Sequence, residues 1–206
     1  MAGENVMNIG IDLDGVLTDI QKFNLKYAPP YFLNKFNRSV VDPNPYDIRD
    51  VFCCPENEYK AYWGRYLLQY AIFEPARPKA KETISKLQKD GHIIYIISKR
   101  VFTCKKNFMG LLMRTLFRNW LWRNKIPYDA IIFCDNDVPD SKKVACLENN
   151  IDVMIDDDTT NIAFIDPTTK IICYDTSYNR DCESENITRV YDWNEIYESI
   201  KILSTA

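Results

Sequence analysis

The sequence contains no run of 18 uncharged apolar residues, so it offers no candidate for a membrane-spanning helix. Its first residues, MAGENVMN, lack the basic start and the apolar core of a secretion signal. We therefore expect a cytoplasmic protein that does not act at a membrane. The net charge of −3 also argues against a general binder of nucleic-acid polymers, although local basic patches remain compatible with it.

Histidine is nearly absent, which limits the metal chemistry that we expect. The single histidine, His92, cannot supply the partners that a zinc site usually needs, and Cys53-Cys54 lacks the C-x-x-C spacing of a zinc clamp. The seven cysteines are an odd number at irregular spacing, so we predict reduced thiols rather than a disulfide framework. Cys134 and Cys173 lie in apolar runs and are predicted to be small core residues.

Length and composition predict one substantial folded core. The chain has 206 residues, and 46% of them are hydrophobic. This is enough for one large core with a small appended module, and it argues against disorder.

The most informative stretch is residues 7–19, MNIGIDLDGVLTD. The apolar run at residues 6–11 predicts a buried strand, and it ends in Asp12-Leu13-Asp14-Gly15. Asp12 and Asp14 are two residues apart, so in an extended backbone both side chains point the same way. Two carboxylates beside a glycine turn suit an oxygen-liganded cation and a phosphate. The alternative is an ordinary turn, which D-x-D-G also forms.

Two later apolar runs also end in polar residues. The run at residues 92–97 leads into Ser98-Lys99-Arg100, at the carboxyl end of a predicted strand, where parallel sheets place ligand contacts. The run at residues 151–155 ends in Asp156-Asp157-Asp158, and three adjacent carboxylates repel one another unless a divalent cation lies among them. The alternative without a ligand is that Ser98 merely ends a strand and that residues 156–158 form a solvated acidic turn.

Residues 20–75 differ in character from the rest of the chain and predict an insertion. They are rich in aromatic residues, are broken by Pro29-Pro30 and other prolines, and show helical spacing at about 20–28 and 56–73. The second segment has a broad face of Tyr59, Tyr62, Trp63, Tyr66, Leu67 and Tyr70. We interpret this face as core by default, and the alternative is that some of its rings stack on a nucleobase.

Four later stretches show helical spacing and are predicted to be helices, at residues 76–91, 105–124, 140–151 and 192–203. We interpret the acidic loop at residues 135–137 as a turn. The residues predicted to face inward from the second and third of these helices are Phe108, Leu111, Leu112, Leu116, Trp120 and Leu121, and Val144, Leu147 and Ile151. The residues expected to contact the insertion or a second subunit are Met109, Met113, Phe117 and Trp122.

Alternating strands and helices predict an α/β protein. Such units form a parallel sheet with helices on both faces, connected by right-handed crossovers. Ligands then bind at the carboxyl edge of the sheet. The fifth apolar run, at residues 170–174, and the polar stretch that follows it complete this pattern.

The polar stretches resemble, in order, the four motifs of the haloacid dehalogenase-like (HAD) phosphatase superfamily. Residues 8–19 resemble motif I, hhhhDxDGVL(T/V)D, Ser98 fits motif II, a lysine at 142–143 fits motif III, and Asp156-Asp157 resembles motif IV. The resemblance extends to 5'(3')-deoxyribonucleotidases and to bacterial nucleotidase-like proteins. It implies a Rossmann-like core at residues 1–19 and 76–206, with a helical C1-type cap at residues 20–75.

The resemblance also implies roles for single residues. Asp12 would be the nucleophile and Asp14 the general acid and base, and Mg²⁺ would be bound by Asp12, Asp157 and the backbone carbonyl of Asp14. Asp156 and Asn161 would lie behind this metal, although many relatives have an acid in place of Asn161.

The phosphate contacts implied by motifs II and III are Ser98 and one lysine. We favour Lys142 over Lys143, because it lies nearer the start of the predicted helix. We include Lys99 among the phosphate-binding residues, whereas Arg100 is either a phosphate contact or a solvated loop charge. In the polar tail, Tyr178-Asn179 and Arg189-Val190 either approach the substrate or satisfy nearby backbone groups.

The implied function is a magnesium-dependent phosphomonoester hydrolase that acts through an aspartyl-phosphate. A nucleoside monophosphate is the preferred substrate, and a sugar phosphate or another small metabolite is the alternative. A further alternative is a catalytically silent interaction module that docks through residues 59–70. A dehalogenase is disfavoured, because it would lack the second aspartate, Asp14.

Overall fold

Within residues 5–205, six strands form one parallel sheet in the order β3-β2-β1-β4-β5-β6. This arrangement is seen in a computed structural model, which describes residues 5–205. The strands are β1 (Asn8–Ile11), β2 (Ile93–Ser98), β3 (Ala130–Phe133), β4 (Val153–Asp156), β5 (Lys170–Tyr174) and β6 (Ile187–Val190). The predicted parallel α/β fold is confirmed. Strand β6 was not predicted, because its four residues, ITRV, include only two aliphatic side chains and follow a polar stretch.

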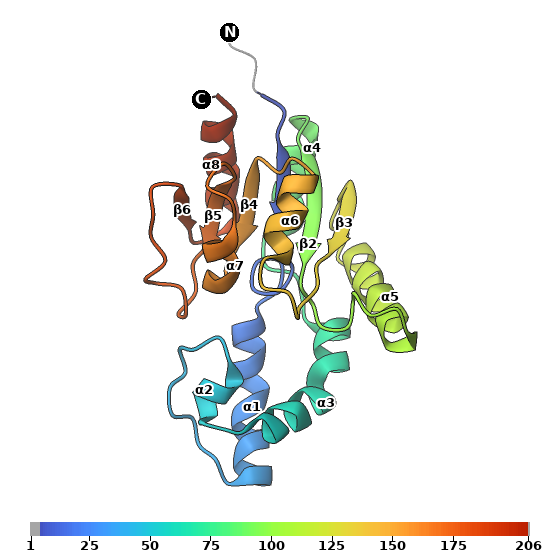
Figure 1. The fold of residues 1–206 in the computed structure, drawn as a ribbon, viewed down its shortest axis with the longest axis vertical. Coiled ribbons are helices and arrows are strands. Elements are labelled where there is room, and N and C mark those ends of the chain that lie inside the picture. The colour runs from blue at the N-terminus through green and yellow to red at the C-terminus, as the bar shows by residue number, and fades with distance from the viewer. Residues whose placement is uncertain (1–4, 206) are drawn as a thin grey trace.

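Helices cover both faces of the sheet (Figure 1). Three of them pack on one face, where Ile9 and Ile155 lie in the core; they are α4 (Ala80–Lys89), α5 (Phe108–Arg123) and α8 (Trp193–Thr205). Two pack on the other face with Ile97 and Met154, and they are α6 (Ser141–Glu148) and α7 (Thr159–Phe164). Within residues 5–205, no helix is both long and apolar enough to span a bilayer.

Three more helices lie beyond the carboxyl ends of the strands (Figure 1). They are α1 (Ile20–Phe36), α2 (Ile48–Phe52) and α3 (Glu56–Phe73), and they come between β1 and β2 in the chain. Their shared core includes Phe32 and Phe52, whose rings stack with centroids 4.3 Å apart. Helix α1 runs on through Pro29 and Pro30, so the predicted end near residue 28 is wrong. Burial of Phe32 outweighs the low helix propensity of the two prolines.

The buried faces of α5 and α6 differ in part from those predicted. In α5, Trp120 and Leu121 are buried as predicted, but Phe108 and Leu111 are 78% and 57% exposed, and Met113 and Phe117 are buried in their place. Helix α5 begins at residue 108 rather than 105, and Gly110 packs so tightly that an added Cβ would lie 1.8 Å from the carbonyl oxygen of Lys105. This close approach requires a glycine at position 110, which the spacing of apolar residues alone does not show.

In α6 the outward side chains are Val144 and Leu147, which are 44% and 47% exposed, so their predicted inward orientation is wrong. Lys142, Ala145 and Cys146 face inward instead. The helix is turned this way because Lys142 is paired with buried carboxylates, described below.

All seven cysteines are free, as predicted from their number and spacing. Cys134 and Cys173 are buried, and burial raises the pKa of each of these thiols to about 12. They are therefore protonated and unreactive near neutral pH.

Strand β1 lies between β2 and β4, and the strand order reverses at this point. The connections lead first from β1 to β2 and β3 on one side, and then back to β4 on the other side. In open parallel sheets, ligands bind in the crevice at the carboxyl ends of such strands. The candidate site is in this crevice.

Candidate active site

Three buried carboxylates meet where β1 and β4 end. Ile11 of β1 is paired with Ile155 of β4, so Asp12 follows one strand beside Asp156 and Asp157 at the end of the other. Carboxylate oxygens of these three acids lie within 4.8 Å of one another. The register of two parallel strands thus brings together acids that are more than 140 residues apart in the chain.

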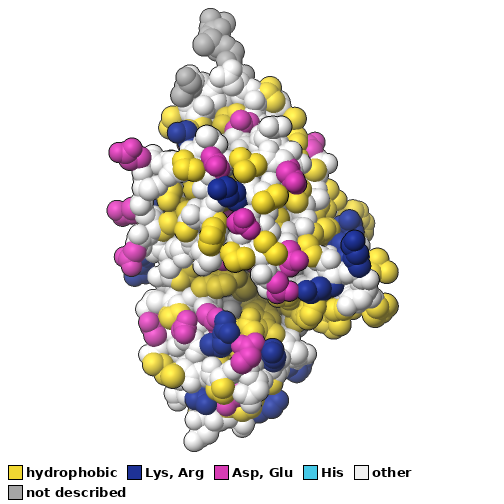
Figure 2. Space-filling model, viewed as in Figure 1, with side chains coloured by type: hydrophobic (Ala, Val, Ile, Leu, Met, Phe, Trp, Pro, Cys, Tyr) yellow, Lys and Arg dark blue, Asp and Glu magenta, His cyan; other side chains and the backbone are white. Residues whose placement is uncertain are grey.

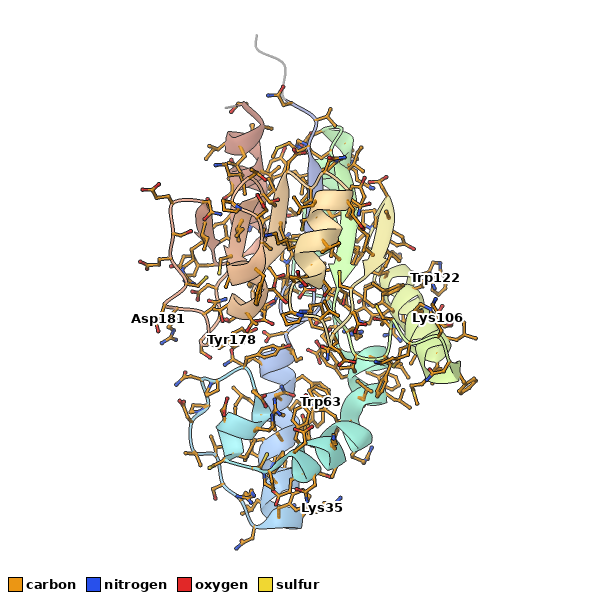
Figure 3. The ribbon with its side chains drawn as sticks, in the orientation of Figure 1. Lys35, Trp63, Lys106, Trp122, Tyr178 and Asp181 are labelled. Atoms are coloured by element: carbon orange, nitrogen blue, oxygen red, sulfur yellow. The ribbon has the colours of Figure 1, made fainter. Side chains whose placement is uncertain are left out.

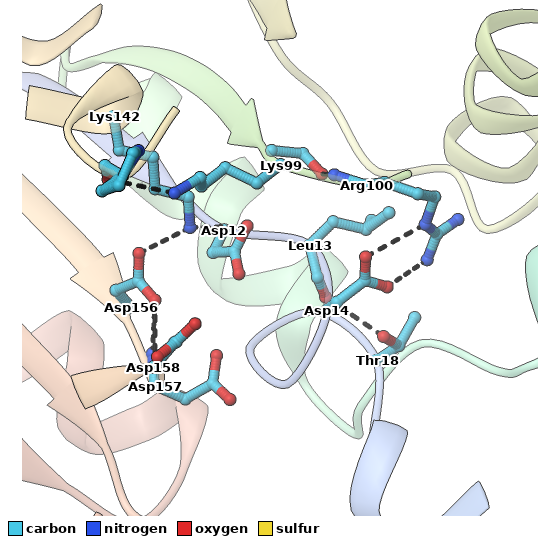
Figure 4. A network of polar contacts seen from close by, with 12 residues as sticks. Asp12, Leu13, Asp14, Thr18, Lys99, Arg100, Lys142, Asp156, Asp157 and Asp158 are labelled. Atoms are coloured by element: carbon cyan, nitrogen blue, oxygen red, sulfur yellow. Dashed lines mark hydrogen bonds and ion pairs between the residues drawn. The ribbon is translucent and has the colours of Figure 1, made fainter. Parts of the chain in front are cut away.

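The ammonium group of Lys142 lies among these acids (Figure 4). Its Nζ is 3.0 Å from Oδ1 of Asp12 and 2.6 Å from Oδ2 of Asp156, and the side chain is 1% exposed. Burial alone would lower the pKa of Lys142, but the two carboxylates raise it above its usual value, so the ammonium keeps its charge. Lys143 points elsewhere: its Nζ is 3.9 Å from Asp166 and its side chain is 39% exposed.

One ammonium does not compensate for three buried carboxylates. Burial, with repulsion from Asp156 and Asp14, raises the pKa of Asp12 to about 8, although Lys142 opposes this shift. Burial and Asp156 also raise the pKa of Asp157 well above its usual value. Such a cluster favours a further cation.

The three consecutive acids have three different environments. Asp156 accepts hydrogen bonds from Lys142 and from the backbone N–H groups of residues 157 and 158. Asp158 accepts one from the N–H of Thr160, which caps the start of α7. Asp157 is fully buried, and its Oδ1 has no partner among the described residues. An unpaired carboxylate oxygen facing other carboxylates fits a hard cation such as Mg²⁺, which prefers oxygen ligands.

Gly15 allows the turn after β1 to pass close to Asp157. Its φ angle is +102°, and a Cβ on this residue would lie 1.9 Å from Oδ2 of Asp157. A side chain at position 15 would therefore displace the carboxylate as well as strain the backbone. This close approach explains why the turn needs a glycine.

Asp14 does not join the three acids. Its two oxygens accept hydrogen bonds from Arg100, with Nε 3.1 Å from Oδ2 and Nη2 bonded to Oδ1 (Figure 4). The hydroxyl of Tyr70, from α3, also donates to Oδ1 at 2.7 Å and lies 2.6 Å from the hydroxyl of Thr18. Burial raises the pKa of Tyr70 well above its usual value, so this phenol remains a donor.

Arg100 is buried, so its interpretation as a solvated loop charge is wrong. Its guanidinium lies between two rings, 5.1 Å from the centroid of Tyr70 and 5.6 Å from that of Phe117. Sequence reasoning could not find the pairing with Asp14, because the two residues are 86 positions apart and follow different strands.

The remaining predicted residues surround the same crevice. Ser98 is fully buried at the end of β2, and its Oγ accepts a hydrogen bond from the N–H of Arg100. Lys99 donates to the carbonyl of Pro139 at 3.0 Å. Asn161 lies in the first turn of α7 and is buried. The loop at residues 135–137 forms a turn in which Asp135 accepts from the N–H of Asp137, as predicted.

Two adjoining cavities lie between the sheet and the helices α1–α3, where Figure 2 shows a hollow. The first, of about 540 Å³, is called here the polar cavity; its lining includes Asp12, Asp14, Lys99, Arg100, Lys142 and Asn161. The second, of about 670 Å³, is called the aromatic cavity; its lining includes Tyr59, Trp63, Leu67, Tyr70 and Phe102. The residues that line both cavities are Asp14, Tyr46, Lys99, Arg100 and Asn136, so the two spaces adjoin at these residues.

The aromatic face of α3 is therefore divided. Tyr62 is fully buried in the core of the helices and donates to Asn24, as the default interpretation predicted. Tyr59 and Trp63 are half-buried and face the aromatic cavity. Figure 3 places Trp63 on the helical side of the hollow and Tyr178 on the sheet side.

Tyr178 and Tyr46 complete the polar cavity from two loops. The hydroxyl of Tyr178, after β5, donates to Oδ2 of Asp157, and its ring lies 5.1 Å from that of Tyr46. The amide of Asn179 donates to the carbonyl of Asp157, so this residue satisfies the backbone. Arg189 likewise donates to three carbonyls of the loop, at residues 179, 180 and 182. Sequence reasoning did not single out Tyr46, because one tyrosine in a proline-rich loop gives no periodic signal.

Comparison with known sequences finds one family whose model matches residues 5–205. This family is described as "5' nucleotidase, deoxy (Pyrimidine), cytosolic type C protein". A nucleotidase of Clostridium acetobutylicum is 27% identical over 93% of this chain and 92% of its own length.

Solved structures with the same fold include a predicted phosphatase and a HAD-superfamily hydrolase. A predicted phosphatase from Clostridium acetobutylicum has a TM-score of 0.62 at 16% identity, over 95% of this chain and 99% of its own. A HAD-superfamily hydrolase from Geobacter sulfurreducens has a TM-score of 0.62 at 12% identity, over 96% of this chain and 98% of its own. At these identities, the likeness shows the fold alone.

Proposed function

The chain belongs to the family of 5' nucleotidase, deoxy (Pyrimidine), cytosolic type C proteins, and from this premise we propose that it hydrolyses a nucleoside monophosphate. It is a phosphoric monoester hydrolase, which confirms the enzyme class inferred from its motifs. The observation that carries the proposal is the buried cluster in which Lys142 lies between Asp12 and Asp156 at a polar cavity.

In the first step, a carboxylate oxygen of Asp12 attacks phosphorus. A bond forms between this oxygen and phosphorus, while the bond from phosphorus to the ester oxygen of the nucleoside breaks. Asp14 gives a proton to the leaving oxygen, so the nucleoside departs as a neutral alcohol. The ammonium of Lys142, 3.0 Å from Asp12, offsets the repulsion between the anionic nucleophile and the phosphate.

In the second step, water attacks the phosphorus of the aspartyl-phosphate. Asp14, now a carboxylate, takes a proton from this water as the new oxygen–phosphorus bond forms. The bond between phosphorus and Asp12 breaks, which regenerates the carboxylate and releases inorganic phosphate. Ser98 and Lys99 are proposed to hold the phosphate during both steps.

Mg²⁺ is the proposed cofactor, held by Asp12, Asp157 and the backbone carbonyl of Asp14. The unpaired Oδ1 of Asp157 and the excess of carboxylates support this assignment. Asp156 and Asn161 are proposed to lie behind these ligands. When bound, the ion supplies positive charge that screens the phosphate from the carboxylates.

The helices at residues 20–75 are proposed to act as a cap over a core at residues 1–19 and 76–206. The phosphate would occupy the polar cavity, and the nucleoside would extend into the aromatic cavity beside Tyr59 and Trp63. Flat aromatic side chains can stack on any base, so this division suits a nucleotide better than a small sugar phosphate.

The test is release of inorganic phosphate by the purified protein with Mg²⁺ from a panel of compounds. The panel contains ribo- and deoxyribonucleoside monophosphates, sugar phosphates and p-nitrophenyl phosphate. We expect nucleoside monophosphates to give the highest kcat/KM. If sugar phosphates gave the highest kcat/KM, the proposed nucleotide substrate would be wrong, but the phosphatase activity would stand. If no compound released phosphate in a magnesium-dependent way, the proposed function would be contradicted.

A further inference from the structure

Arg100 has one guanidinium nitrogen to spare. Nε and Nη2 hold the two oxygens of Asp14, whereas Nη1 is buried and has no hydrogen-bond partner among residues 5–205. A buried, charged N–H group without a partner is costly, so such a nitrogen needs an explanation. Arg100 lines both cavities, which puts this side chain within the space that we assign to the substrate.

Asp14 accepts three hydrogen bonds. Both of its oxygens accept from Arg100, and Oδ1 accepts from Tyr70 as well. The proposed reaction requires an oxygen of Asp14 to meet the leaving oxygen of the substrate and then a water. Among residues 5–205 the partner of Oδ2 is Arg100, so release of Arg100 would free this oxygen for both roles.

We propose that Arg100 is a substrate-binding residue that exchanges partners, holding Asp14 in the free enzyme and binding the phosphate during turnover. This inference rests on the proposed function. The planar fork of a guanidinium fits a carboxylate and a phosphate equally well, so the same side chain can serve both anions. The flanking rings of Tyr70 and Phe117 keep the guanidinium in place while its partner changes.

The exchange is tested by calorimetric binding of inorganic phosphate, with Mg²⁺ present, to four proteins. They are the wild type, Arg100→Gln, Asp14→Asn and the double variant. We expect Arg100→Gln to weaken phosphate binding about tenfold or more, because charge-assisted hydrogen bonds are lost. Asp14→Asn should tighten binding, because the competitor for Arg100 is gone, and it should have no such effect when Arg100 is already Gln.

Arg77 provides the matched control. It too pairs with a carboxylate of the motif I stretch, with Nη1 3.0 Å from Asp19, and it donates to the carbonyl of Gly15. It lines neither cavity, so Arg77→Gln should leave phosphate affinity within about twofold of the wild type. Should Arg100→Gln fail to fold, Arg100→Lys retains the charge without the fork, and the tightening by Asp14→Asn should shrink in that background.

Two results would overturn the exchange. One is an unchanged phosphate affinity in Arg100→Gln, which would make Arg100 a structural partner of Asp14 only. The other is equal tightening by Asp14→Asn in both backgrounds, which would reflect simple removal of a negative charge. Failure of the proposed function is a separate result, because it would appear as an inactive wild-type protein before any variant is compared.

Discussion

Two regions of the molecule face each other across the cavities, and they present side chains of different kinds. At the carboxyl edge of the sheet, one ammonium and three carboxylates are buried in one cluster. In helices α1–α3, aromatic rings pack on one another, as Tyr62 does on Tyr66 with centroids 5.0 Å apart. The first region concentrates charge on fixed strand ends, and the second presents flat apolar surface.

This difference separates two kinds of function. Charges placed by strand register suit bond making and breaking, because small displacements would disrupt them. Rings such as Tyr59 and Trp63, which line the aromatic cavity, suit substrate selection, because they lie apart from the charged cluster. We therefore expect variants at the sheet edge to lower kcat for every substrate, and variants at Tyr59 or Trp63 to change KM for large substrates only.

The largest expected effect is at the nucleophile. Asp12→Asn should lower kcat at least about 1000-fold, because a near-isosteric amide cannot form the phosphoenzyme. Steady-state phosphate release measures the loss, and circular dichroism checks that the fold is kept. Activity within tenfold of the wild type would contradict the assignment of Asp12 as the nucleophile.

Lys142 and Lys143 form a natural pair for the next test. Lys142→Ala should lower kcat/KM about 100-fold, because the buried ammonium no longer offsets Asp12 and the phosphate. Lys143→Ala should change it less than about twofold, because that side chain is partly exposed and away from the acids. Equal losses in the two variants, measured with p-nitrophenyl phosphate, would contradict the assignment.

The buried acids at the sheet edge and the acidic loop at residues 135–137 are expected to differ in their contribution to Mg²⁺ binding. Asp157→Ala should weaken Mg²⁺ binding about 100-fold, because it removes a buried oxygen ligand. Asp135→Ala should leave Mg²⁺ affinity unchanged, since Asp135 lies in a turn outside the buried cluster. Calorimetry of Mg²⁺ binding compares them, and similar losses would mean that the wrong acids were chosen.

The smallest effect is expected on the aromatic side. Trp63→Ala should raise KM for the preferred nucleotide about tenfold, the size of one stacking contact, and spare p-nitrophenyl phosphate. Trp122→Ala is the matched control, because this ring is 80% exposed on α5 and lines neither cavity. An equal loss of kcat/KM for both substrates would indicate that Trp63 only packs in the core of the helices and does not contact the base.

The sequence predicted the placement of some residues far better than that of others. Asp12, Ser98 and Asp156-Asp157 follow apolar runs, and parallel pairing brings the ends of such runs to one edge, so their proximity follows from the pattern. Lys142 was located to within one position, because a helix start points at the same edge. These inferences needed only local periodicity and the rule for parallel sheets.

The periodic spacing of apolar residues could not predict contacts between loops. Arg100 pairs with Asp14, and Tyr178 packs on Tyr46, only because distant connections meet in the folded chain. In α5, Met113 and Phe117 are buried in place of Phe108 and Leu111, which the spacing of apolar residues does not reveal. Tertiary packing decides such features, and a single sequence carries little signal for them.

The central claim is that Asp12 becomes phosphorylated by the substrate. With p-nitrophenyl phosphate, whose leaving group departs without a proton, Asp14→Asn should slow breakdown of this intermediate more than its formation, because the base that activates water is lost. Acid quenching during turnover, followed by mass spectrometry of the peptide that contains residue 12, measures it directly. We predict one phosphoryl group on Asp12 in Asp14→Asn and none in Asp12→Asn. A phosphoryl group on another residue, or release of phosphate with no labelled protein at any time, would contradict the account.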